Sequence, residues 1–125
     1  MTPQSLQDMK SNSVITDEFM KQRLAQTREY CVMILHHGPK WNQPERDKIV
    51  WEHGRRNFQL RAEGILSIVC PIADGSDVNG LGIFNTTVAE TKKLMEEDPG
   101  VKAGVFTCEL HACRGFPGDA LRNER

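Results

Sequence analysis

The chain lacks an excess of charge of either sign. Its 125 residues include 16 basic and 17 acidic side chains, which gives a formal net charge of −1. A protein that holds nucleic acid needs a basic surface to neutralise the phosphates. The sequence therefore predicts no nucleic-acid partner.

Long apolar runs are also missing. No stretch approaches the roughly 20 consecutive apolar residues that a helix needs to cross a bilayer, so we expect no membrane partner. Residues 1–10 show neither the basic nor the apolar region of a signal peptide. We therefore expect a cytoplasmic protein.

The four cysteines have no metal-binding spacing. There is no C-x-x-C pair, and the closest two, Cys108 and Cys113, have four residues between them. No H-x-x-x-H pattern or Cys–His cluster is present either. We expect free thiols, most of them behaving as small hydrophobic strand residues, and neither a metal nor another cofactor.

What is present is an alternation of apolar strands and amphipathic helices. We predict a flexible arm over residues 1–16 and a single α+β domain over residues 17–125. Thr87 and Glu90 form a capping-box signature at the start of one helix. The predicted helices are Thr16–Ala25, Glu45–Ala62 and Thr87–Glu97, and the predicted strands are Glu29–His37, Ile65–Pro71, Gly80–Asn85 and Lys102–Ala112.

This order predicts a ferredoxin-like βαββαβ fold with an extra N-terminal helix. Two strand–helix–strand crossovers place both of their helices on one face of a four-stranded sheet. The strands Glu29–His37 and Ile65–Pro71 carry apolar residues on both faces. An apolar sheet face without helices is typical of an interface, so the sequence predicts a homodimer with its sheets packed face to face. Association of dimers into a higher oligomer stays open.

Two polar residues fall where chemistry could take place. His53 lies on the inner stripe of the helix Glu45–Ala62, where the simpler interpretation is a core histidine with a satisfied hydrogen bond. Pro99 forces Asp98 out of the helical region, and Glu96, Glu97 and Asp98 crowd three anions at the negative end of a helix dipole. Asp98 would gain from a cationic or hydrogen-donating partner. Its alternative role is to cap the following turn.

These residues belong to a pattern that resembles the YCII-related family. The pattern comprises a helix histidine (His53), a proline that ends the second strand (Pro71), and the segment Asp98-Pro99-x-x-x-Ala-Gly-Val-Phe that enters the last strand. The resemblance covers roughly residues 30–112. It implies a dimeric α+β barrel with a pocket between sheet and helices, in which His53 and Asp98 form a catalytic dyad.

The chain departs from the family pattern in two places. Cys70 stands where the family has a glycine before the proline, and the N-terminal helix and the loop around Trp41 are longer than in small members. Both differences change the surroundings of the implied pocket. The resemblance therefore leaves the substrate open.

The first hypothesis for function is a cofactor-free enzyme of the isomerase, dehydrochlorinase or other lyase type. Asp98 would fix the tautomer of His53, whose second nitrogen would take and return a proton of a small acidic or aromatic molecule. The second hypothesis is a non-catalytic domain that binds or senses a small molecule. A haem- or metal-handling barrel with a histidine ligand ranks last, because no ligand cluster supports it.

Further residues are candidates for the pocket wall, each with a simpler alternative. His36 and His37 point to opposite sheet faces, so at most one of them lines a given pocket. Trp41 closes over a ring-shaped ligand or anchors its loop, and Arg56 holds an anionic substrate or lies on a solvated helix face. Cys70 is a nucleophile only beside positive charge. The complete set of candidate pocket residues is His36, His37, Trp41, Arg56, Cys70, Pro71, Glu109 and His111.

Overall fold

The computed structural model describes residues 14–125. These residues form two compact units. The first unit comprises the described residues up to Arg28 together with Arg114–Arg125, and the second is Glu29–Cys113. The flexible arm predicted for residues 1–16 falls mostly outside the described part. The prediction of a single domain over residues 17–125 stays a prediction.

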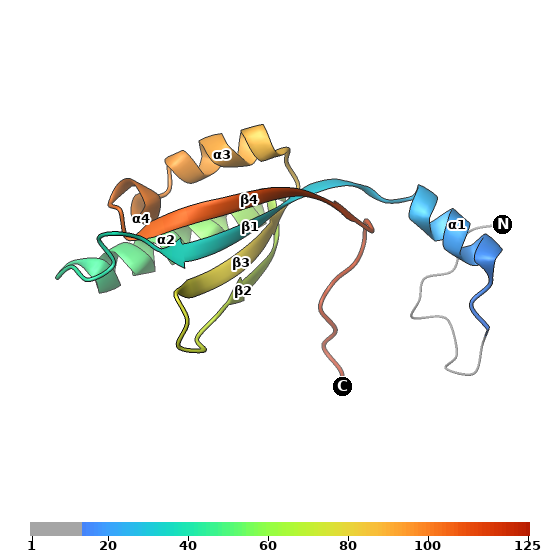
Figure 1. The fold of residues 1–125 in the computed structure, drawn as a ribbon, viewed down its shortest axis with the longest axis horizontal. Helices are drawn as coiled ribbons and strands as arrows, with labels where there is room; N and C mark the ends of the chain where they lie inside the picture. Colours follow the sequence, from blue (N-terminus) through green and yellow to red (C-terminus); the bar gives the residue numbers. More distant parts are fainter. Residues whose placement is uncertain (1–13) are drawn as a thin grey trace. The chain divides into compact units, whose positions relative to one another are not determined.

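The elements follow the predicted order, with one addition (Figure 1). The short helix α4 lies between α3 and the last strand. The complete order is α1 (Asp17–Ala25), β1 (Arg28–His37), α2 (Arg46–Ala62), β2 (Leu66–Pro71), β3 (Val78–Phe84), α3 (Val88–Glu96), α4 (Pro99–Lys102) and β4 (Phe106–Gly115). The sheet order is β2-β3-β1-β4, with β3 antiparallel to both β1 and β2. The predicted α+β, ferredoxin-like βαββαβ fold with an extra N-terminal helix is confirmed.

The predicted start of the last strand is wrong. Lys102 closes helix α4, and β4 begins only at Phe106. Asp98 causes this difference, because its side chain accepts hydrogen bonds from the backbone N–H groups of Gly100 and Val101 and so caps a new helical turn. Gly104, with φ of 73°, then turns the chain into the strand.

Alternating side chains of the sheet build the core of the second unit. In β1, Cys31, Met33 and Leu35 are buried, and they pack with Leu60 of α2 and Met95 of α3. Since both helices contribute to one core, both cover the same sheet face. The intervening residues of the sheet point away from these helices and are only partly buried; the apolar ones are Val32, Ile34, Ile68, Leu81 and Ile83.

The first unit contains α1, which Thr16 caps by accepting a hydrogen bond from the N–H of Phe19. Arg114 donates two hydrogen bonds to Thr27, at 3.0 Å to Oγ1 and 2.6 Å to the carbonyl oxygen. The guanidinium of Arg23 lies 5.3 Å from the ring centre of Phe116. These contacts connect the two chain segments that make up this unit. Among residues 14–125, no helix is long and apolar enough to span a membrane.

Candidate functional site

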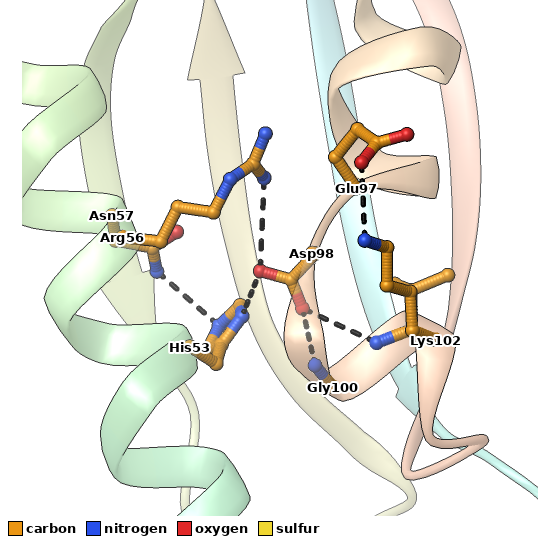
Figure 2. A network of polar contacts seen from close by, with 8 residues as sticks. His53, Arg56, Asn57, Glu97, Asp98, Gly100 and Lys102 are labelled. Atoms are coloured by element: carbon orange, nitrogen blue, oxygen red, sulfur yellow. Dashed lines mark hydrogen bonds and ion pairs between the residues drawn. The ribbon is translucent and has the colours of Figure 1, made fainter.

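The carboxylate of Asp98 is completely buried, and each of its oxygens has a separate function (Figure 2). Oδ2 accepts the backbone N–H groups of Gly100 at 2.9 Å and Val101 at 3.2 Å. Oδ1 lies 2.8 Å from Nδ1 of His53. The two roles predicted as alternatives, capping the next turn and pairing with a donor, are therefore both present in one side chain.

His53 reaches Asp98 from the middle of α2, and only 6% of the residue is exposed. Its Nε2 lies 3.2 Å from the amide nitrogen of Asn57, one helical turn later. Because an amide nitrogen only donates, Nε2 accepts, and the ring proton resides on Nδ1 and points at Asp98. This hydrogen bonding fixes the tautomer and leaves the basic lone pair on Nε2.

Gly100, two residues after Asp98, has no space for a larger side chain. A Cβ on Gly100 would lie 2.4 Å from Cδ2 of Phe106, and the Phe106 ring in turn contacts the His53 ring with centroids 4.8 Å apart. Pro99 occupies the first helical position, where its missing N–H costs nothing. The proline and the glycines of the Asp98–Phe106 segment thus serve to hold the carboxylate against α2.

Arg56 brings a second cation to the same carboxylate. Its Nη1 is 3.9 Å from Oδ1 of Asp98, within range of an ion pair but too far for a hydrogen bond. This nitrogen is buried and finds no hydrogen-bond partner in the described part of the chain. Arg56 therefore contributes positive charge beside Asp98, whereas the exposed Glu97 pairs with Lys102 at 3.1 Å.

His53 opens onto a cavity of about 370 Å³ between α2 and the sheet. Its polar wall residues are His53, Asn57, Arg61 and Asn79, and the apolar side chains of its wall include Met33, Leu35, Val50, Phe58 and Val69. This volume suits a small organic molecule, and a mostly apolar wall with a few polar groups is typical of a ligand site.

Glycines in β3 leave room for this cavity. Gly80 and Gly82 both line it, and they occupy alternate, buried positions that face the helices. A Cβ at Gly82 would lie 3.2 Å from Leu66 and 3.3 Å from Met33. The Gly-Leu-Gly alternation was the one sequence signal that could have located the pocket, because glycine inside a strand marks a close approach. Asn57, Arg61 and Asn79 carried no such signal.

The structure brings together only part of the predicted pocket set. Cys70 and Pro71 border the cavity beside His53, and Arg56 lies against Asp98 instead. His36, His37, Trp41, Glu109 and His111 are not among the residues that line this cavity.

The remaining aromatic and histidine candidates form two separate groups. The Trp41 ring stacks on His37 with centroids 3.7 Å apart, and the guanidinium of Arg46 lies 4.6 Å from the Trp41 ring. On the sheet, Glu109 binds His111 at 2.6 Å and His36 at 3.0 Å. Hydrogen bonds from His111 and then His36 hold the pKa of the Glu109 carboxyl below its ordinary value. Among residues 14–125, no group of three or more His, Cys, Asp or Glu side chains could hold a metal ion.

Removing the Asp98 carboxylate should destabilise the fold strongly. We expect Asp98→Ala to lower the free energy of unfolding by about 3–5 kcal/mol, since it breaks a buried pair and removes the cap of α4. Asp98→Asn, which keeps an accepting oxygen, should lose about 1–3 kcal/mol. Urea denaturation measures both, with the exposed Glu97→Gln as the matched control. Equal free energies of unfolding for Asp98→Ala and Glu97→Gln would show that the pair with His53 and the cap of α4 do not stabilise the fold.

The thiol of Cys108 should resist alkylation. Burial, followed by the nearby negative charge of Asp98, raises its pKa from 9.0 to about 12. The reactive thiolate forms only as the pH approaches the pKa, so about a thousandfold less of it is present below pH 9 than for a thiol with the ordinary pKa. Mass spectrometry after iodoacetamide treatment at pH 8 should find Cys108 modified only upon unfolding. Rapid modification in the native protein would refute this assignment.

Comparison with solved structures adds a structural likeness. The chain is similar to the 5-chloro-2-hydroxyhydroquinone dehydrochlorinase of Burkholderia phenoliruptrix, solved in complex with 2,5-dihydroxybenzoquinone. The two share 15% identity with a TM-score of 0.48, over 66% of this chain and 90% of the other. No family model and no curated protein matches the sequence. Membership of the YCII-related family stays a prediction.

Proposed function

We propose that this protein is a cofactor-free enzyme that moves a proton on a small acidic or aromatic molecule, an isomerase, dehydrochlorinase or other lyase. The observation that carries the proposal is the His53–Asp98 pair at 2.8 Å, with the opposite ring nitrogen at a ligand-sized cavity.

The chemistry follows from the two ring nitrogens. A substrate that displaces the Asn57 amide from Nε2 offers its proton to that nitrogen, and the resulting imidazolium lies against the Asp98 carboxylate. In an isomerisation the ring returns the proton to another atom of the substrate. In an elimination the electron pair of the broken C–H bond forms a double bond, and a leaving group departs from the neighbouring carbon.

Charge and shape of the cavity support the substrate class. Arg61 provides a guanidinium that can pair with an acidic group. Phe58 and the aliphatic side chains of the wall suit a flat ring. The positions of Arg56 and Arg61 favour an anionic intermediate over a cationic one, because both bring positive charge to this side of α2.

The alternative is a non-catalytic domain that binds or senses a small molecule. The observation that favours it is the hydrogen bond from Asn57 to Nε2, which occupies the nitrogen that catalysis requires. In this case the pair serves to shape the pocket and to donate hydrogen bonds.

Deuterium exchange separates the two functions without knowledge of the product. A panel of small acidic and aromatic compounds with exchangeable C–H groups is incubated with the protein in D₂O and followed by NMR. We expect exchange into at least one compound, and we expect His53→Gln to slow it by about 10²-fold or more, the usual contribution of a general base. Lys92→Glu, an exposed change on α3, is the control. Saturable binding without exchange would establish the binding domain instead.

We also propose that the protein forms a homodimer through the sheet face opposite α2 and α3. Its apolar residues include Val32 and Ile34 of β1, which pair with Ile83 and Leu81 of β3. Contiguous apolar surface of this kind is typical of a protein interface. A second copy of the same face would cover it symmetrically.

A charge in this face should prevent the association. We expect Ile34→Glu to halve the molar mass measured by light scattering, because each interface would bury two unpaired carboxylates. Lys92→Glu again controls for charge alone. An unchanged mass for Ile34→Glu in a folded protein would exclude this interface.

A further inference from the structure

The outer surface of α2 carries two aromatic side chains that the core does not use. Trp51 is 70% exposed and Phe58 is 73% exposed. Between them Gly54 has no atom within 4 Å of the position where a Cβ would lie. These residues, with Asp47, Val50 and Arg55, line a second, shallow hollow of about 380 Å³ on the helix surface.

We propose that this surface binds a second copy of the chain, with the two α2 helices antiparallel and crossing at Gly54. The proposal does not rest on the catalytic function or on the dimer through the sheet, although Phe58 and Arg61 also line the His53 cavity. It rests on a self-complementary arrangement of residues along one helix.

The arrangement is symmetric about Gly54. With about 100° of rotation per residue, Asp47 and Arg61 lie within about 20° of the direction of Gly54, and Val50 and Phe58 within about 40°. Trp51 lies about 60° from it, on the same side as Phe58. All of these side chains therefore belong to one stripe, and Gly54, without a side chain, marks the point where two helices can approach most closely.

Charge complementarity selects the antiparallel orientation and a second copy as the occupant. In an antiparallel pair centred on Gly54, a residue seven positions before the glycine faces a residue seven positions after it, about 10.5 Å along the axis from the crossing. Asp47 of each copy thus faces Arg61 of the other. The side chain of Asp47 is 97% exposed, with Nε of Arg46 3.5 Å from its Oδ1, and Arg61 is exposed, so a second copy can reach both side chains.

The same geometry pairs the aromatic residues. Trp51 precedes Gly54 by three residues and Phe58 follows it by four, on the same side of the stripe. Trp51 of one copy therefore comes beside Phe58 of the other, and the pair occurs twice because the contact is isologous. Two such pairs flanked by two Asp–Arg pairs form an apolar centre with a charged rim, as protein interfaces do.

This contact would also complete the wall of the His53 cavity. Val50, Gly54 and Phe58 line both the cavity and the outer hollow. A second helix laid over Gly54 covers the border between the two. Together with the sheet interface, the helix pair would join sheet dimers into a higher oligomer.

A charge-swap series on the full chain tests the interface. Sedimentation and light scattering measure the molar mass of the wild type, Asp47→Arg, Arg61→Asp and the double variant. Each single variant places like charges opposite one another, so we expect the helix-mediated dissociation constant to rise about tenfold or more. The double variant restores opposite charges and should recover the wild-type assembly. Failure of the double variant to recover it would overturn the pairing.

A second variant tests the close approach at the crossing. A Cβ at Gly54 has open space in the single chain, because nothing lies within 4 Å of it, and glycine is a poor residue inside a helix, so Gly54→Glu is compatible with a folded helix. In the helix pair it brings two carboxylates together at the symmetry axis, so the molar mass should fall by half. Circular dichroism verifies that the variant is folded. A folded Gly54→Glu variant with the wild-type mass would exclude the contact.

The sheet interface is distinguished by combining these variants with Ile34→Glu. If both interfaces exist, each class of variant reduces the assembly to a dimer, and the combination yields a monomer. If only Asp47→Arg and Gly54→Glu reduce the mass, the helix contact stands without the sheet dimer. If only Ile34→Glu does, the helix contact is refuted.

Discussion

The buried carboxylate of Asp98 is the constraint on which much of this structure depends. A charge with no exposure to solvent must have all its electrostatic needs met by the protein. Here two backbone N–H groups satisfy one oxygen, and an imidazole with a nearby guanidinium satisfies the other. The hydrogen bonds from the N–H groups of Gly100 and Val101 cap α4, and the contacts with His53 and Arg56 fix α2 against Asp98. One side chain thereby joins three parts of the fold: the end of α3, the short α4 and the middle of α2.

The same constraint sets the character of the candidate site. Because Asp98 accepts the Nδ1 proton, the ring of His53 presents its lone pair along α2 toward Asn57 and the cavity. Phe106, held in place by its contact with Gly100, shields the pair from the side of β4. The imidazole therefore lies at the border between a closed core and a space large enough for a ligand.

Two apolar surfaces remain once this core is built: the sheet face opposite the helices and the aromatic stripe of α2. They differ in how they arise. The sheet face follows from strands with apolar residues at both alternating sets of positions. The stripe on α2 follows from a helix that carries Trp51 and Phe58 on one side and His53 and Leu60 on the other. Both surfaces fit association of identical chains, since each can be covered by its own copy.

The sequence by itself determined the order and type of the main elements. The capping box at Thr87, the glycine after α2 and the alternating strands act locally, over a few residues, so their signals survive without tertiary context. It also singled out His53 and Asp98, because a histidine on an inner helix stripe and a carboxylate crowded against helix-end anions each need a partner, and the resemblance to the YCII-related family implied that they form a pair. Only the tertiary structure decided that the two meet, that Asp98 caps α4 as well, and that the last strand begins at Phe106 rather than Lys102. The tertiary structure alone showed that Trp41 and His37, and the histidines His36 and His111 that bind Glu109, do not line the cavity. It also showed that Asn57, Arg61 and Asn79 belong to the cavity wall. The physical reason is that a cavity is formed by side chains distant in the sequence, whose meeting depends on sheet register and on the spacing of α2 above the strands.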